Sequence, residues 1–370
     1  MCGISGFIDL KNKISISKKK KISKKLNKIN SRRGPDGDGI WFSSDYSVCF
    51  CHTRLSIIDL SNMGSQPMLS QNGRFIITYN GEIYNYRELR KKHEIKTNGN
   101  SDTELLVELI NLYGLEKTLD MIDGMYAFAL WDKKLKKFYI IRDRFGIKPL
   151  YWSKKDGIIV FSSDLRVFRE LYTNLDVSID SVKNFLIHSY IPAPLSILKD
   201  VYKVLPGELI IFDKQKIMKK SYWNYEKKSN KIILPENEYR EGLEQKISEV
   251  VKSHMVSDRE ISCFLSGGVD SSLISLMTQK NSQKKIKTYT VGFNDRNFDE
   301  AKHAKEISKY IQSDHHEIYL NSKDMLDTIY TLGEIYDEPF ADSSQVPTSI
   351  ICKWISNYHK VVLSGDGGDE

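Results

Sequence analysis

The chain has few cysteines and no long apolar segment, and both absences limit what it can be. Its five cysteines are an odd, scattered set, which is not a disulfide framework. Cys49 and Cys51 lack the C-x-x-C spacing of zinc sites, so we expect two small core residues on one side of a strand. No apolar run approaches the roughly 18 residues of a membrane span, and the N-terminus does not have the pattern of a signal peptide. We therefore expect a cytoplasmic protein with no metal site built on cysteine or histidine.

The 370 residues carry a net charge of +7, and much of it lies in a lysine-rich run over residues 11–30. A basic run can bind nucleic acid or an anionic membrane. Ile22, Leu26 and Ile29 recur within it at helical spacing, which favours a packed amphipathic helix with a solvated face. No aromatic residues suited to base stacking accompany the lysines. We therefore expect neither a nucleic acid nor a membrane as partner.

The pattern of expected elements changes at residue 237. Before it, short alternating strands predict sheet layers covered by helices. The helices are expected near residues 18–30, 85–92, 102–114 and 179–187. From residue 237 helices alternate with strands near 260–265, 287–293, 315–320 and 360–365, which predicts a parallel, doubly wound sheet. The polar stretch 226–236 between the two parts is a candidate linker.

A glycine-rich turn, FLSGGVDSS at 264–272, follows one of these strands and opens a helix. Glycines let the backbone approach a ligand, and a helix start offers free N–H groups and a positive dipole end. Asp270 would repel a phosphate unless a cation such as Mg²⁺ bridges the two. The lysine of a P-loop is missing, and the loop resembles the S-G-G-x-D-S loop of enzymes that bind pyrophosphate and adenylate a substrate. The alternative is a plain glycine turn that ends a strand.

The chain opens MCGISG, which places a thiol directly after the initiator. If Met1 is removed, Cys2 carries both a thiol and a free α-amine. An α-amine has a pKa of roughly 7.7–8.0, so it can take the thiol proton directly or through a water. The resulting thiolate can attack a carbonyl. An incidental cysteine in a first strand is the alternative, and MCGISG alone does not decide between them.

Three further segments offer the polar groups that such a nucleophile needs. Asn80 and Gly81 can form an oxyanion hole, although Asn-Gly is also an ordinary hairpin turn. Arg54 is suited to hold a carboxylate in a bidentate manner, although it can equally be a surface arginine of a strand. Asp102, near an expected helix start, is either a cap or a partner for an ammonium group.

The ordered motifs resemble the glutamine-hydrolysing asparagine synthetase family over essentially the whole chain. They are MCGISG, RRGPDGDG, HTRLSIIDL, YNGEIYN, SDTE, GMYAFALWD, RDRFGIKPLY and YIPAP, then FLSGGVDSS, TVGF, DEPFADSSQVPT and LSGDGGDE. The resemblance implies an α+β N-terminal-nucleophile glutaminase, a four-layer αββα sandwich, over residues 1–225. After the linker, it implies the N-terminal part of an α/β, doubly wound, adenine-nucleotide α-hydrolase-like synthetase domain over 237–370.

The resemblance also assigns roles in the glutaminase half. It implies that Cys2 attacks the side-chain amide of glutamine, that Asn80 and Gly81 stabilise the oxyanion, and that ammonia leaves before water releases glutamate. The glutamine-binding residues that it implies are Arg54, Leu55, Ser56, Ile57, Ile58, Asn80, Gly81, Glu82 and Asp102.

In the second half the resemblance implies that ATP converts a carboxylate to an acyl-adenylate and that ammonia then displaces AMP. The implied ATP-binding residues are Leu265, Ser266, Gly267, Gly268, Asp270, Ser271, Ser272, Val291, Ser364 and Gly365. Asp366 matches a position tied to formation of the intermediate, and Asp270 and Asp369 are candidate Mg²⁺ ligands. Each of these carboxylates can instead be a loop cap.

Two positions depart from the family pattern. Arg32 replaces a histidine found in many members, and Asp366 replaces a glutamate, which shortens the reach by one methylene and could alter the acceptor. The chain also stops at Glu370, whereas the family continues to a lysine assigned to the adenylation step, so we expect a truncated chain.

We expect glutamine-dependent asparagine synthesis from aspartate, with a homodimer as a possible assembly. The alternatives are the same chemistry on another carboxylate, such as a sugar acid in cell-surface polysaccharide biosynthesis, and a glutaminase alone. A nucleic-acid-binding protein built on the basic run ranks last.

Overall fold

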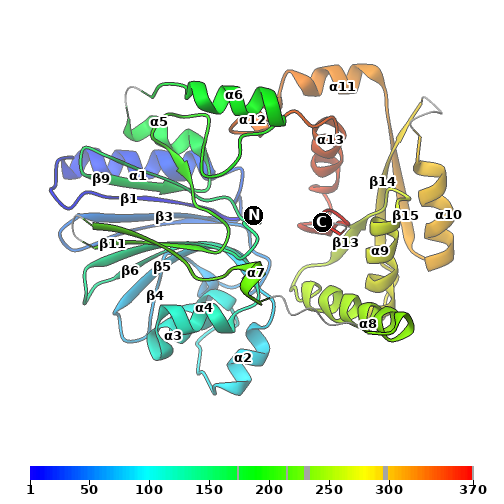
Figure 1. Ribbon diagram of the computed structural model, residues 1–370, viewed down its shortest axis with the longest axis horizontal. Coiled ribbons are helices and arrows are strands. Elements are labelled where there is room, and N and C mark those ends of the chain that lie inside the picture. Colours follow the sequence, from blue (N-terminus) through cyan, green and yellow to red (C-terminus); the bar gives the residue numbers. More distant parts are fainter. Residues whose placement is uncertain (173–174, 214–215, 229–233, 295–298, 369–370) are drawn as a thin grey trace. The chain divides into compact units, whose positions relative to one another are not determined.

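The computed structural model describes residues 1–172, 175–213, 216–228, 234–294 and 299–368 (Figure 1). Within them the chain forms two compact units. The first unit comprises the described residues up to 228 together with the short segment Asp337–Ala341. The second unit comprises the remaining residues from 234 onward.

The first unit contains two six-stranded antiparallel sheets. The strand order of one sheet is β10-β8-β9-β1-β3-β2. Its strands are β1 (Gly3–Ile8), β2 (Gly37–Phe42), β3 (Val48–Arg54), β8 (Tyr151–Lys155), β9 (Ile158–Ser162) and β10 (Tyr202–Lys203). The order of the other sheet is β12-β11-β7-β6-β5-β4. Its strands are β4 (Met68–Leu69), β5 (Phe75–Ile83), β6 (Gly124–Asp132), β7 (Lys137–Arg142), β11 (Glu208–Asp213) and β12 (Lys216–Ser221).

The core of the first unit lies between the two sheets. Phe50 and Phe161 of one sheet pack on Phe138 of the other, with ring centroids 5.4–5.9 Å apart. Alternate residues on each strand point inward here, because successive side chains of a strand face opposite sides. The expected short strands follow from this alternation.

Helices cover the outer face of each sheet, as Figure 1 shows. On one side lie α1 (Ile16–Asn30) and α5 (Phe168–Leu171), and on the other lie α3 (Asp102–Tyr113) and α4 (Leu115–Met121). The remaining helices of this unit are α2 (Tyr86–Lys92), α6 (Ile179–His188), α7 (Tyr225–Lys228), η1 (Asn62–Gly64) and η2 (Leu165–Val167). The four-layer αββα sandwich is therefore confirmed.

The lysine-rich run forms the amphipathic helix that its spacing predicted. Ile22 and Leu26 of α1 are buried and pack in one cluster with Cys49 and Cys51 of β3. The two sulfur atoms lie 3.7 Å apart on one side of that strand. Most lysines of α1 are exposed, but Lys19 is buried.

The second unit is built on a parallel sheet of order β15-β14-β13-β16. Its strands are β13 (Ile261–Phe264), β14 (Lys287–Phe293), β15 (Asp314–Leu320) and β16 (Val361–Leu363). Its helices are α8 (Glu236–His254), α9 (Val269–Asn281), α10 (Ala301–Ile311), α11 (Ser322–Ile329), α12 (Leu332–Ile335) and α13 (Gln345–Ile355).

Both faces of this sheet are covered. Cys263 of β13 contacts Ser275 and Thr278 of α9, whereas the next residue, Phe264, packs with Ile351 and Ile355 of α13. Neighbouring residues of a strand point to opposite faces, so helices lie on both sides and the doubly wound architecture is confirmed. Among the described residues, none of the helices combines the length and the apolarity that crossing a membrane requires.

Candidate functional site

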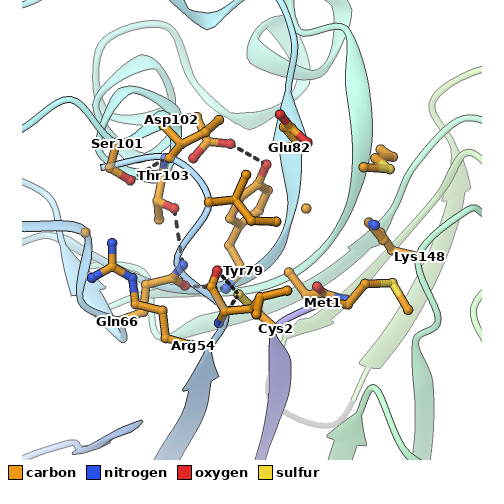
Figure 2. Close-up of a pocket in the computed structure, with 17 residues that line it drawn as sticks. Met1, Cys2, Arg54, Gln66, Tyr79, Glu82, Ser101, Asp102, Thr103 and Lys148 are labelled. Atoms are coloured by element: carbon orange, nitrogen blue, oxygen red, sulfur yellow. Dashed lines mark hydrogen bonds between the residues drawn. The ribbon is translucent and has the colours of Figure 1, made fainter. Parts of the chain in front are cut away.

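A pocket in the first unit gathers residues from β3, β5, the start of α3 and the chain's N-terminus (Figure 2). Every residue predicted for this half lines it, with the exception of Ser56. The main-chain N–H of Ser56 donates to the Asp36 carboxylate at 2.9 Å instead. The pocket is lined by Met1, Cys2, Arg54, Leu55, Ile57, Ile58, Gly64, Gln66, Tyr79, Asn80, Gly81, Glu82, Ser101, Asp102, Thr103, Met125 and Lys148.

The thiol of Cys2 is held by the main chain of Leu55. Its Sγ accepts a hydrogen bond from the Leu55 N–H at 3.4 Å and donates to the Leu55 carbonyl at 3.7 Å. Burial raises the pKa of this thiol, and the hydrogen bond from Leu55 acts in the opposite direction. Burial lowers the pKa of the Met1 α-ammonium to about 5. The Met1 α-amine is therefore mostly neutral at pH 7.

Asn80 and Gly81 lie inside β5, so the hairpin-turn alternative is wrong. Asn80 is 1% exposed, and its Nδ2 has no hydrogen-bond partner among the described residues. An unpaired buried donor costs about 1–3 kcal/mol, so its presence in a pocket indicates a partner that arrives with a ligand. A side chain at position 81 would come within 2.8 Å of the Tyr126 Cα and collide with the Met125 carbonyl. Only glycine fits there.

The guanidinium of Arg54 is fixed by the loop that follows β3. Its Nη1 donates to the Ser61 carbonyl at 2.7 Å, and its Nη2 donates to the Asp59 carbonyl. Gly64 packs against the same group, and a side chain there would collide with it. Arg54 is thus a fixed cation at the pocket and not a freely moving surface residue.

Asp102 is the first residue of α3 but does not cap it. The cap is Ser101, whose hydroxyl accepts from the Thr103 N–H at 3.1 Å. The Asp102 carboxylate turns toward β5, where it accepts from the Tyr79 hydroxyl at 2.8 Å and from the Ile83 N–H at 3.1 Å (Figure 2). The interpretation of Asp102 as the helix cap is therefore wrong, and its carboxylate lies at the pocket.

Two oppositely charged groups complete the electrostatics of the pocket. Burial, and then the charge of Asp102, raises the pKa of Glu82 to about 8. Burial lowers the pKa of the Lys148 ammonium to about 8, and the charge of Glu82 acts against that shift. The net charge of the pocket therefore changes near neutral pH, where Glu82 and Lys148 titrate.

Sequence reasoning did not single out several residues at or beside this site, among them Arg33, Gln66, Tyr79 and Lys148. Gln66 bridges two elements, because its Oε1 accepts from the Tyr79 N–H at 2.7 Å and its Nε2 donates to the Thr103 hydroxyl at 3.2 Å. Arg33 donates from Nε to the Cys2 carbonyl at 3.1 Å. Arg33 and Lys148 do lie in quoted motifs, RRGPDGDG and RDRFGIKPLY, but a motif does not say what its residues contact.

A second cavity lies in the second unit, at the carboxyl ends of the parallel strands, where ligands bind in open α/β sheets. Of the predicted nucleotide-site residues, it is lined by Leu265, Ser266, Gly268, Asp270, Ser271, Val291, Ser364, Gly365 and Asp366. Gly267 and Ser272 do not line it, and Asp369 lies outside the described residues. The cavity is also lined by residues of the quoted motifs TVGF and DEPFADSSQVPT to which the sequence analysis gave no role, including Thr290, Phe293, Ser343, Ser344 and Thr348.

The glycine-rich loop between β13 and α9 depends on Gly267 and Ser272, the two predicted residues of this loop that do not line the cavity. Gly267 has a φ of +91°, and a side chain there would come within 2.9 Å of the His303 Cβ in α10. The Ser272 hydroxyl donates to the Gly268 carbonyl at 2.5 Å. A side chain at Gly365 would come within 2.6 Å of the Ser271 main-chain nitrogen, so the loop after β16 lies directly against the first turn of α9.

The carboxylates that line this cavity include Asp270 and Asp366. Asp270 lies in the first turn of α9. Asp366 accepts a hydrogen bond from the Ser364 hydroxyl at 3.0 Å. In the part of the chain that the structure describes, no group of three or more histidine, cysteine, aspartate or glutamate side chains could hold a metal ion by itself. The described side chains of this cavity therefore do not form a metal site by themselves.

Comparisons with known proteins match both parts of the chain to known families. Residues 1–223 match the family described as "Glutamine amidotransferase domain", and residues 242–370 match "Asparagine synthase". All of this chain aligns at 34% identity with 75% of a Methanocaldococcus jannaschii protein whose name places it among the glutamine-hydrolysing asparagine synthetases. All of it also aligns with 58% of asparagine synthetase [glutamine-hydrolyzing] 1 of Bacillus subtilis, at 31% identity, and with 64% of asparagine synthetase B of Escherichia coli, at 30%. The chain thus spans between about half and three quarters of these relatives. It belongs to the glutamine-hydrolysing asparagine synthetase family, a family of glutamine-dependent ligases.

Proposed function

We propose that this chain hydrolyses glutamine with Cys2 and transfers the ammonia to aspartate that ATP has activated, giving asparagine. The observation that carries the first half is that one pocket is lined by the partly buried thiol of Cys2 and by Asn80, whose Nδ2 is unpaired among the described residues. In this proposal the glutaminase domain covers residues 1–225, the linker 226–236, and the synthetase domain begins at 237.

The hydrolysis begins once Met1 is removed. The α-amine of Cys2 takes the thiol proton, and the thiolate attacks the side-chain amide carbon of glutamine. The negative charge that forms on the amide oxygen is stabilised by the Asn80 Nδ2–H and the Gly81 N–H. The amine then returns the proton to the leaving nitrogen, ammonia departs, and water hydrolyses the thioester to glutamate and the free thiol.

The charges of the pocket match the two ends of an amino acid. The fixed guanidinium of Arg54 suits the α-carboxylate of glutamine. Glu82 and Asp102, on the opposite side of the pocket in Figure 2, suit the α-ammonium. Bringing that cation to Glu82 favours the ionised carboxylate and lowers its pKa from about 8.

The second cavity would hold ATP. The N–H groups and hydroxyls of the loop 266–272 would receive its phosphates, and Leu265 and Val291 would lie beside the nucleoside. Mg²⁺, held by Asp270 and in this proposal by Asp369, would supply the charge that neutralises the phosphates. Asp366, held by Ser364, would face the acceptor where the acyl-adenylate forms.

The relatives named asparagine synthetase support aspartate as the acceptor. One feature favours a second candidate. Asp366 stands where many members carry glutamate, and its shorter side chain leaves room for a larger carboxylate such as a sugar acid. The same chemistry would then serve another biosynthetic route. Residence in the cytoplasm and a homodimer also stay predictions.

The test is glutamate release from glutamine by the full chain, beside Cys2→Ala, followed by AMP formation with ATP and Mg²⁺. Release that vanishes in Cys2→Ala supports the nucleophile, and glutamate release by Cys2→Ala would contradict it. AMP that forms with aspartate but not with sugar acids supports asparagine synthesis. AMP that requires a sugar acid supports the second candidate.

A further inference from the structure

Tyr79 lies in β5 directly before Asn80 and Gly81 and lines the same pocket as they do. It is only 2% exposed, and its side chain reaches from β5 to the first turn of α3. There its hydroxyl donates to Oδ2 of Asp102 at 2.8 Å (Figure 2). One residue therefore joins the strand of the proposed oxyanion donors to a carboxylate that is proposed to meet the α-ammonium of glutamine.

The main chain of Tyr79 is held by side chains where a neighbouring strand is missing. β4 pairs with β5 only at Ile76 and Ile77, so this pairing ends before Tyr79. The Gln66 Oε1 accepts from the Tyr79 N–H at 2.7 Å, and the His52 Nε2–H donates to the Tyr79 carbonyl at 3.3 Å. Burial lowers the pKa of His52 to about 3, so its ring is neutral at pH 7 and carries its proton on the nitrogen that faces this carbonyl. The two bonds fix β5 immediately before the oxyanion donors.

The start of α3 is tied to the same stretch of β5. Oδ2 of Asp102 accepts a second hydrogen bond, from the Ile83 N–H at 3.1 Å. The Gln66 Nε2 donates to the Thr103 hydroxyl at 3.2 Å. Asp102 and Thr103 are 5% and 2% exposed. Two donors on one oxygen of a buried carboxylate fix its orientation before any ligand arrives.

This fixed orientation matters for the binding of an α-ammonium. A charge-assisted hydrogen bond depends on geometry, and a side chain that is already ordered loses little conformational freedom on binding. Without the phenol hydroxyl, the Asp102 carboxylate would lose one of the donors that hold its Oδ2. The loss would fall on ligands that bring an ammonium, whereas a ligand without this group would have nothing to lose.

We propose that Tyr79 is a positioning residue that makes the pocket select amides carrying an α-ammonium. Its hydroxyl holds the Asp102 carboxylate for that cation. Gln66 holds both sides of this contact, because it binds the Tyr79 main chain and the start of α3 at Thr103. The proposal rests on the proposed hydrolysis of glutamine and adds the residue on which recognition of the α-ammonium depends. Tyr79 acts through Asp102 and not on the amide that reacts.

The first test compares Tyr79→Phe with Tyr113→Phe in the full chain, by glutamate release without ATP. Tyr113 is at the other end of α3 and outside the pocket, and its hydroxyl lies 3.0 Å from the His93 Nδ1, so the control also loses one phenol hydrogen bond. We expect Tyr79→Phe to raise KM for glutamine about tenfold, as loss of one hydrogen bond to a charged group would. We expect kcat to stay within about twofold, because Cys2 and Asn80 are unchanged.

A substrate analogue separates selection of the ammonium from general damage to the pocket. Glutaramate is glutamine with a hydrogen in place of the α-ammonium, and its binding is measured as the inhibition constant against glutamine hydrolysis. We expect Tyr79→Phe to leave this constant within about twofold of the wild-type value, because glutaramate brings no cation to Asp102. A damaged pocket would bind glutamine and glutaramate more weakly by similar factors.

The proposal is overturned if Tyr79→Phe has the KM of Tyr113→Phe, if kcat falls while KM stays, or if the inhibition constant of glutaramate rises by the same factor as KM. Should Tyr79→Phe fail to fold, two variants of Thr103 decide. Thr103→Val removes the hydroxyl that accepts from Gln66 and must raise KM for glutamine alone, whereas Thr103→Ser keeps that hydroxyl and the wild-type KM. Failure of the underlying function is visible separately, since the wild type then releases no glutamate or Cys2→Ala still does.

Discussion

Replacement of Asn80 by alanine tests the proposed oxyanion hole, because it removes the side-chain Nδ2 that would donate to the oxyanion. The Nδ2 is buried and unpaired among the described residues, so it can stabilise only a group that arrives in the pocket. Removing one oxyanion donor typically costs about 2.7–4 kcal/mol in the transition state. With about 1.36 kcal/mol for each factor of ten, kcat should fall by roughly 10²- to 10³-fold.

The same substitution should change stability very little. Truncation removes a buried unpaired donor, whose burial costs about 1–3 kcal/mol, and leaves a small cavity that costs a comparable amount. The two effects oppose each other. We therefore expect a large loss of kcat, a nearly unchanged KM and a melting temperature close to that of the wild type.

The assay is steady-state glutamate release together with thermal unfolding of the same preparation. Asn72→Ala, in an exposed turn outside the pocket, is the matched control and should keep the wild-type kcat. A kcat for Asn80→Ala within about threefold of the control would refute the reasoning. So would a loss of stability that accounts for the whole loss of activity.

Three more predictions follow from single contacts. The Glu82 carboxylate must ionise to bind an ammonium, and its pKa is raised to about 8, so KM for glutamine should fall as pH rises from 6 to 8. Glu82→Gln should have a KM that does not vary over this range, and a profile unchanged from the wild type would count against this role. Gly365→Ala, whose Cβ would lie 2.6 Å from the Ser271 nitrogen, should raise KM for ATP in AMP formation and leave glutamate release intact; equal losses in both assays would contradict it. Lys19→Met leaves the buried Asp9 carboxylate, 3.1 Å from the Lys19 ammonium, without its cation. The free energy of unfolding measured by urea titration should therefore fall by about 3–5 kcal/mol. A change below about 1 kcal/mol would show that the pair contributes little.

Periodicity and ordered motifs predict the two architectures well, because local patterns determine them. Ile22 and Leu26 repeat at helical spacing and lie on the buried face of α1. Cys49 and Cys51 alternate on a strand and face the same side. Residues that the sequence motifs singled out, such as Asn80 in β5, also line the pocket.

Contacts between distant segments could not be predicted in this way. Nothing in the sequence near Asp102 says that Ser101 takes the cap and frees its neighbour for Tyr79. Nor does any local pattern say that Asp337 is seated beside Leu165, 172 positions earlier in the chain. Such contacts depend on how sheets and loops pack, and side-chain polarity alone does not encode that packing.

The most direct test of the central claim is the mass of the N-terminal peptide after the protein reacts with an electrophilic glutamine analogue. The account predicts that Met1 is absent, that one equivalent of the analogue is bound to the Cys2 sulfur, and that glutamate release is lost in parallel. An adduct on another residue, or full glutamate release by protein whose Cys2 is completely modified, would contradict it.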